Sequence, residues 1–293
     1  MGCDDITIAI EFRYPPPVLC PVCASPQRDT RIIAGLTIHR CRECGLRTSP
    51  VVERKGTSYS DVDTAAYANS IGRVRQAQGE EVVSFARKHG ANGEWLDVGC
   101  GYGYVLDAAR AAGFRVRGIE PDAMAASAAN ARGIDVHHGQ LEETTPPADV
   151  LSTLDVIEHL DDLNAFAALV KSKCRLWVIK VPSSDGMFFR IAHALRIRGA
   201  VERLWQTQYR HPHVVYFNER ALGRFLRNHG CEVLATRYLQ EVPMRTALSR
   251  LTLARDMPRW KAWLALVPIL AINLIERLRR KSDALLVIAR VTS

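Results

Sequence analysis

The sequence predicts an α/β fold in which a mostly parallel sheet carries helices on both faces. Two observations point to this fold: apolar, strand-like runs alternate with helical periodicity from about residue 94 onward, and a glycine-rich turn follows the first of these runs. At 293 residues the chain is long enough for one large domain or two modest ones with an apolar core. Ligands of such sheets bind at the carboxyl ends of the strands, so functional residues are expected there.

The spacing of apolar residues places the elements in chain order. Val74 to His89 has a helical pattern that Gly90 ends. The alternation that follows predicts strands at 95–98, 115–119, 134–137, 150–156 and 175–181, and helices at 103–112, 122–132 and 163–170. An amphipathic helical stretch is expected at 187–201. Asn218 is expected to cap a helix over 219–229, before strands at 231–238 and 284–291.

The glycine turn lies in Glu94-Trp-Leu-Asp-Val-Gly-Cys-Gly-Tyr-Gly-Tyr104, and a helix and a second strand follow it, closed by Glu120. This order is typical of nucleoside-binding sheets, in which the acid meets the ribose. Asp97 stands at the end of the first strand, ahead of the glycines. A carboxylate there would repel a pyrophosphate but attract an amino-acid ammonium. The pattern therefore favours S-adenosylmethionine (SAM) over a dinucleotide.

Leu96 to Gly103 and Glu120 resemble the first two motifs of class I SAM-dependent methyltransferases. Asp155-Val-Ile-Glu-His-Leu160 resembles their fourth-strand motif, in the form found in ubiquinone-biosynthesis and sugar-modifying enzymes. The resemblance implies a Rossmann-like, seven-stranded methyltransferase sheet with a helical insertion at about 240–281 before the last strand. It also implies transfer of a methyl group to an oxygen or carbon of a small metabolite, with a sugar or a lipid-linked molecule as candidate acceptors.

The resemblance further assigns residues to the cofactor. Asp97 is expected to face the methionine ammonium, and Glu120 to accept both ribose hydroxyls. Gln140 takes the place of an acid that related enzymes set against the adenine amino group, and its amide oxygen could still accept that bond. The other expected cofactor contacts are Gly99, Gly101, Gly103, Leu141 and Asp155.

Three residues are candidates for the chemistry. A neutral His159 could take a proton from the acceptor, with Glu158 orienting it or binding a metal. Similar enzymes also place a histidine near His211, whereas His213 is assigned more readily to loop backbone. The alternative is that His159 caps a helix and packs against the cofactor. Neither His211 with His213 nor His137 with His138 has the partners expected of a catalytic metal site.

Four of the eight cysteines form the pairs Cys20-Pro-Val-Cys23 and Cys41-Arg-Glu-Cys44, with 17 residues between the pairs. This spacing predicts a zinc ribbon, and four thiolate ligands make the zinc structural because no position stays open. The isolated Cys100, Cys174 and Cys231 are interpreted as small core residues. The chain thus divides into a lead-in and zinc ribbon (1–50), a linker and N-terminal helix (51–92) and a SAM-binding domain (93–293).

The formal net charge of +8 is spread along the chain, which is typical of solvated faces; anionic substrates and a membrane surface are the alternatives. The apolar run 260–275 is too short to span a bilayer and is broken by Pro268 and Asn273. Together with the basic residues that follow, up to 281, it could lie in a headgroup layer. It could instead form a substrate lid or a dimer surface.

The start of the chain shows no signal peptide, so the cytoplasm is the expected location, with membrane association as an alternative. Two other functions compete with methylation of a small molecule. One is a nucleic-acid methyltransferase that uses the ribbon and the basic surface, which is disfavoured because the fourth strand lacks an amine-holding motif such as Asn-Pro-Pro-Tyr. The other is a non-catalytic SAM-binding module. The sequence does not predict an oligomeric state.

Overall fold

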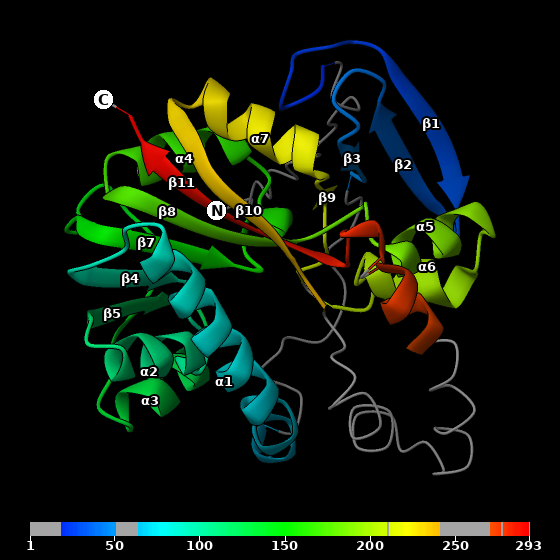
Figure 1. Cartoon of the computed structure of the whole chain (residues 1–293). Helices are drawn as coiled ribbons and strands as arrows, with labels where there is room; N and C mark the ends of the chain where they lie inside the picture. Colours follow the sequence, from blue (N-terminus) through cyan, green and yellow to red (C-terminus); the bar gives the residue numbers. More distant parts are fainter. Residues whose placement is uncertain (1–18, 51–63, 210, 241–269, 277, 293) are drawn as a thin grey trace, which may run out of the picture.

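The computed structural model describes residues 19–50, 64–209, 211–240, 270–276 and 278–292, which build a large sheet flanked by helices and a small N-terminal sheet beside it (Figure 1). The lead-in up to residue 18, most of the linker (51–63) and most of the insertion (241–269) lie outside the described residues.

The large sheet has seven strands in the order β10-β11-β8-β7-β4-β5-β6. Their bounds are β4 Glu94–Val98, β5 Arg115–Glu120, β6 Asp135–His138, β7 Ala148–Leu154, β8 Cys174–Pro182, β10 Cys231–Leu239 and β11 Ala284–Val291. The strands from β4 to β8 pair in parallel, whereas β11 runs antiparallel to both β8 and β10. The predicted seven-stranded sheet is therefore confirmed, together with the late antiparallel strand that follows the insertion.

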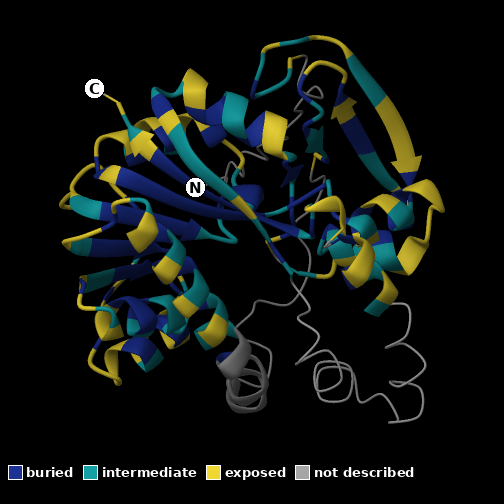
Figure 2. Ribbon diagram, in the orientation of Figure 1, coloured by how far each residue is buried: buried dark blue, intermediate teal, exposed yellow. Residues whose placement is uncertain are grey.

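Helices cover both faces of this sheet (Figure 1). They are α1 (Thr64–Lys88), α2 (Tyr104–Ala111) and α3 (Ala123–Asn130) on one face, and α4 (Leu163–Lys171) and α7 (Glu219–Asn228) on the other. Successive side chains of β8 alternate between the faces: Leu176 and Val178 join the core under α1 to α3, while Trp177 and Ile179 join the core under α4 and α7. Both faces are buried, as parallel sheets require (Figure 2).

Local signals placed most helix starts correctly. The side chain of Asn218 accepts the backbone N–H of Ala221 at 2.7 Å, which confirms it as the cap of α7. The expected stretch at 187–201 is divided into α5 (Met187–Ala194) and α6 (Arg198–Leu204), because Arg196 between them is left-handed at φ 52°. No glycine or proline marks that break. Helix α1 begins at Thr64, ten residues before the start that its apolar spacing indicates.

The N-terminal sheet is completed by a strand from much later in the chain. It contains β1 (Arg28–Ile33), β2 (Leu36–Cys41), β3 (Arg47–Thr48) and β9 (Val215–Tyr216), and β3 pairs antiparallel with β9. Behind these strands, the ribbon residues Val22, Cys44 and Leu46 belong to the same apolar core as α4 and α7. The ribbon and the large sheet are therefore packed as one body.

Three of the four cysteines outside the two pairs behave as predicted, and the fourth, Cys3, lies outside the described residues. Cys100, Cys174 and Cys231 are buried and belong to the apolar cores. In the part of the chain that the structure describes, no helix has both the length and the apolar character needed to span a membrane.

Candidate functional site

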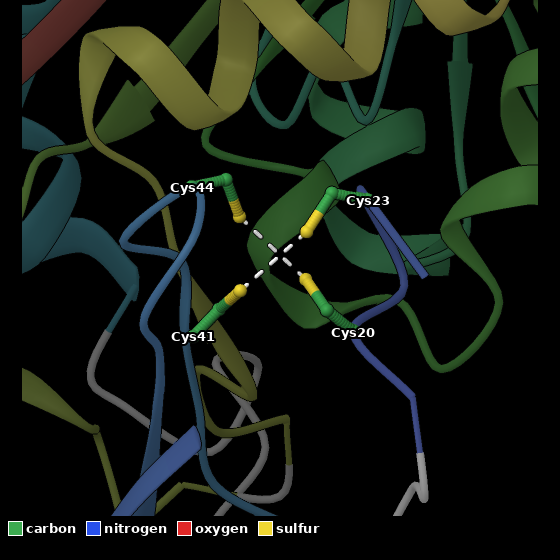
Figure 3. A group of neighbouring side chains, drawn as sticks. All are labelled: Cys20, Cys23, Cys41 and Cys44. Atoms are coloured by element: carbon green, nitrogen blue, oxygen red, sulfur yellow. Dashed lines mark hydrogen bonds between the residues drawn. The ribbon is translucent and has the colours of Figure 1, made fainter. Parts of the chain in front are cut away.

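The four paired cysteines converge on one point (Figure 3). Their sulfurs lie within 4.8 Å of one another, with 3.6 Å between Cys20 and Cys44 and 3.5 Å between Cys23 and Cys41. In a tetrahedral site with zinc–sulfur bonds of about 2.3 Å, neighbouring sulfurs lie about 3.8 Å apart. The donor set and its spacing thus fit a structural zinc ion.

Two asparagines at opposite ends of α7 bind the turns that carry the cysteines. Asn218 caps the start of the helix, and Asn228 is its last residue. The Asn218 amide donates to the carbonyl of Cys44 at 3.2 Å, and the Asn228 amide donates to the carbonyl of Val22 at 2.6 Å. Gly45, at φ 80°, lets the chain pass close to Asn218, because an added Cβ would lie 2.3 Å from the Asn218 amide nitrogen. The position of each turn is therefore coupled to α7.

The glycine turn that follows β4 has the shape of a nucleoside cradle. Gly99, Gly101 and Gly103 have φ values of 71°, 53° and 76°, in the left-handed region that only glycine enters readily. A Cβ on Gly101 would meet nothing within 4 Å, whereas Cβ atoms on Gly99 and Gly103 would collide with Val156 and Ile134. The turn thus packs tightly against Val156 and Ile134 at its two ends, and the space beside Gly101 in its middle is open.

Two buried carboxylates stand at the carboxyl ends of β4 and β5. Asp97, 2% exposed, accepts a 2.5 Å hydrogen bond from Ser152, whose oxygen accepts in turn from the Trp95 indole. Glu120, 7% exposed, accepts the backbone N–H groups of Gly101 and Asp122 at 2.6 and 2.8 Å. Burial raises the pKa of Glu120, while these two N–H donors oppose the rise. That these two acids meet the ammonium and the ribose of the cofactor stays a prediction.

Burial, assisted by the nearby Glu120 and opposed by the Ser152 hydrogen bond, raises the pKa of Asp97 to about 7. A bound ammonium favours the charged carboxylate, so a protein whose Asp97 is protonated must release a proton on binding. We expect the affinity for S-adenosylhomocysteine, measured calorimetrically, to fall about tenfold from pH 8 to pH 6. The stability of the unliganded protein has the opposite pH dependence. Folded Asp97 keeps its proton up to a higher pH than unfolded Asp97 does, so the free energy of unfolding falls as the pH rises from about 4 to 7.

The matched variant for this measurement is Asp97→Asn, which keeps the shape of the side chain without its charge. Its affinity should be lower and nearly independent of pH over the same interval. A wild-type affinity that stays constant from pH 6 to pH 8 would contradict the assigned role of Asp97.

The other expected cofactor contacts occupy different environments. Gln140 is exposed just beyond β6, and Leu141 is buried in the apolar core. Asp155 follows β7 directly, at φ 58°, and its carboxylate forms 2.8 Å ion pairs with Lys180 and Arg75. Burial works against the charged form of Asp155, but the two cations outweigh it and hold its pKa well below the usual range. Contact of these residues with the cofactor stays a prediction.

Lys180 and Arg75 were not identified from the sequence. The Lys180 side chain is only 3% exposed and interrupts the otherwise apolar run 176–182 within β8. A single charge inside such a run indicates a buried partner, so this signal could have been recognised.

A second polar cluster lies beside the glycine turn. Glu158 and His159 form the short helix η2 (Ile157–His159) that follows β7, and Val156 just before it is the residue that packs against Gly99. The ring of His159 lies 4.7 Å from that of His213, measured between centroids. Glu158 is fully buried, His213 is 7% exposed and His159 is partly buried.

Both imidazoles are held by their Nδ1 atoms. The His159 Nδ1 lies 3.1 Å from the carbonyl oxygen of Pro212, and the His213 Nδ1 lies 3.1 Å from the hydroxyl oxygen of Tyr216. Burial lowers the pKa of both rings, that of His213 to about 3. Both imidazoles are therefore neutral at pH 7.

The structure thus brings Glu158 and His159 together with His213 rather than with His211, which is exposed and lies outside this group. No partners of a metal site were identified from the sequence for His213, and the structure places two potential donor residues beside it. The two other donors precede it by more than 50 residues and reach it only through the fold, so local spacing could not show them.

A protein-family model described as a methyltransferase domain matches residues 71–236, more than half of the chain. No curated protein matches the sequence significantly. Several solved structures share the fold. They include a SAM-dependent methyltransferase from Archaeoglobus fulgidus, with 16% identity, a TM-score of 0.50 and coverage of 74% of this chain and 94% of that one. Another is the cyclopropane synthase MmaA2 from Mycobacterium tuberculosis, with 14% identity and a TM-score of 0.53. That alignment covers 73% of this chain and 83% of the synthase.

A third structure, magnesium protoporphyrin IX methyltransferase from Synechocystis with bound S-adenosylhomocysteine, is 13% identical with a TM-score of 0.50. The alignment covers 76% of this chain and 86% of that protein. At these identities the structural likeness concerns the fold alone.

Proposed function

The chain belongs to the class I SAM-dependent methyltransferases, and we propose that it methylates an oxygen or carbon of a small metabolite that carries phosphate, such as a sugar or a lipid-linked acceptor. The observation that carries this proposal is a group of four arginines, three on the N-terminal sheet and one on α5, that form no ion pair within the described residues. The group lies next to the strand that leads out of the second polar cluster.

SAM, when bound, supplies a methyl group on a positively charged sulfur. In the transfer, a lone pair of the acceptor forms a bond to the methyl carbon, the carbon–sulfur bond breaks, and its electrons stay on sulfur while the acceptor gives up a proton. The protein must hold the two reactants in line and keep water out. In this proposal Asp97 and Glu120 hold the cofactor, and Glu158, His159 and His213 face the acceptor. The support is that both groups adjoin the glycine turn.

Three of the arginines share one face of the N-terminal sheet, and the fourth lies on α5 beside it. Arg40 of β2 lies directly opposite Arg47 of β3, and Arg31 lies diagonally across from Arg40 on the neighbouring strand β1. Arg190 of α5 is close enough to act on the charge of Arg47, whose guanidinium rests on the ring of Phe189 at 5.2 Å. We call Arg31, Arg40, Arg47 and Arg190 the arginine face.

The positive charges of the arginine face repel one another. Burial lowers the pKa of Arg47 to about 10, and the like charges of Arg40, Arg31 and Arg190 add to this effect against a weaker opposing influence from Asp185. Within the described residues, none of the four guanidiniums forms an ion pair with a carboxylate. A phosphate group would relieve this repulsion and could accept paired hydrogen bonds from the guanidiniums.

The arginine face also adjoins the second polar cluster, where the acceptor is proposed to bind. Arg47 pairs across strands with Tyr216, and the hydroxyl of Tyr216 contacts the ring of His213. A phosphate bound at this face would therefore tether an acceptor whose other end reaches the second polar cluster.

The test is transfer of labelled methyl from SAM to phosphate-linked sugars and polyprenyl-phosphate sugars, each compared with the same sugar without phosphate. We expect the Arg40→Gln/Arg47→Gln double variant to raise KM at least tenfold with little change in kcat, because the lost contacts bind but do not react. Arg290→Gln, which alters an exposed arginine on β11, is the control. Equal use of phosphorylated and free acceptors, or methylation of RNA or DNA instead, would contradict the proposal.

We also propose that Cys20, Cys23, Cys41 and Cys44 hold one structural zinc ion. The support is the convergence of four sulfurs at separations that suit tetrahedral coordination. Its test is whether the Cys44→Ser variant loses the ion.

A further inference from the structure

We propose that Glu158, His159 and His213 form a second metal site, distinct from the cysteine cluster, for a divalent first-row ion. One donor atom from each residue can be chosen so that all three lie within 4.8 Å of one another. Around an ion with bonds of about 2.1 Å, donor atoms lie about 3.0 to 4.2 Å apart, so small side-chain adjustments close the site. Two imidazoles and one carboxylate are a donor set that zinc and iron ions accept.

The hydrogen bonds of the two rings select the tautomer that a metal site needs. The carbonyl oxygen of Pro212 can only accept, so His159 carries its proton on Nδ1. The Tyr216 hydroxyl donates its own proton to the carbonyl of Leu204 at 2.7 Å and can therefore accept from His213 Nδ1. Each neutral ring then presents the bare lone pair of its Nε2. An oxygen that fixes the far nitrogen in this way is the usual support of a metal-bound histidine.

The three donors are also held by backbone contacts between their segments. The backbone N–H of Val214 donates to the carbonyl of Glu158 at 2.8 Å, and that of His213 donates to the carbonyl of Trp205 at 3.1 Å. These bonds tie the loop that carries His213 to the short helix that carries the other two donors. A site whose donors are held before the ion binds avoids much of the ordering cost of binding.

Metal binding would give the Nε2 of His159 the role of a ligand, in place of the base role expected from the sequence. A cation beside the cofactor can lower the pKa of an acceptor hydroxyl, so that its proton passes to solvent before the oxygen takes the methyl group. The three protein donors leave coordination positions open for such an acceptor. This consequence rests on the proposed function and makes its acceptor atom a hydroxyl oxygen.

The metal site is tested by binding rather than by turnover. Full-length protein with one equivalent of zinc in the ribbon is freed of other metals with EDTA and titrated with Co²⁺, followed by visible absorption and calorimetry. We expect one Co²⁺ per chain with the spectrum of nitrogen and oxygen ligands. Any cobalt that displaced the ribbon zinc would reveal itself by the intense thiolate charge-transfer band.

Four variants locate the ion. Glu158→Gln, His159→Gln and His213→Gln should each weaken Co²⁺ binding at least tenfold, whereas the control His211→Gln, which alters the exposed neighbour, should leave it unchanged. S-Adenosylhomocysteine titration of each variant shows whether the cofactor half of the site is folded, independently of the metal. Glu158 is fully buried, so the partly buried His159 provides the safer substitution if Glu158→Gln does not fold.

The proposal is overturned if wild-type protein that binds S-adenosylhomocysteine takes up no Co²⁺ at millimolar concentration, or if the folded variants bind it as tightly as wild type does. Neither result would touch the methyltransferase assignment, which depends on cofactor binding and methyl transfer.

Discussion

The Cys44→Ser variant is expected to lose its zinc and to unfold the N-terminal sheet, with a decrease of several kcal/mol in the free energy of unfolding of the whole chain. Binding of structural zinc contributes about 10 to 16 kcal/mol of folding free energy in small zinc-dependent peptides, so loss of one of four ligands removes a large part of it. The effect should reach beyond the ribbon because Cys44, 1% exposed, is part of the core under α4 and α7.

The measurements are zinc content by elemental analysis and urea denaturation followed by circular dichroism. Cys231→Ser is the matched control, because Cys231 is also a buried cysteine, 4% exposed, but lies outside the cluster. It should keep one zinc per chain and lose only about 1 to 3 kcal/mol, the cost of a polar atom in a small core space. A Cys44→Ser variant as stable as Cys231→Ser would show that the ribbon contributes little to the fold.

Replacing Asp155 with asparagine is expected to destabilise the protein by about 3 to 5 kcal/mol. Its carboxylate forms ion pairs with Lys180, whose side chain is 3% exposed, and with Arg75. Asparagine tolerates the left-handed backbone of this position as aspartate does, so the change removes charge and leaves the local geometry acceptable. The cost arises because the Lys180 ammonium stays buried without its partner carboxylate.

A double variant separates charge from shape. Asp155→Asn/Lys180→Met removes both charges of the pair and should regain much of the stability lost in the single variant, as measured by urea denaturation. Methionine preserves the length of the lysine chain. If the single substitution proves neutral, or the double variant is less stable than Asp155→Asn alone, then burial of Lys180 is not what makes Asp155 necessary.

The parts of the structure that the sequence predicted are those set by local pattern. The strands of the large sheet follow from apolar runs, the turn after β4 from glycines that must adopt positive φ, and the start of α7 from the capping preference of Asn218. The cysteine cluster was equally accessible, because two closely spaced pairs already restrict where four sulfurs can meet.

What the sequence missed depends on contacts between distant segments. Strands β3 and β9 have only two residues each, too few to show any periodicity, and 166 residues lie between Thr48 and Val215. The choice between His211 and His213 had the same difficulty. Each is a histidine in a loop, and only the fold shows that His213 is buried beside His159 while His211 faces solvent.

The pairing of β3 with β9 means that the two halves of this protein cannot be treated as separable modules. A fragment that began at α1 would leave Val215 and Tyr216 as a bare strand edge, next to apolar side chains such as Phe217 that the ribbon helps to cover. Such an edge invites pairing with other molecules and aggregation. In this chain the ribbon therefore covers a strand edge that would otherwise be open to pairing, and we expect a fragment that lacks the ribbon to aggregate unless β9 is changed as well.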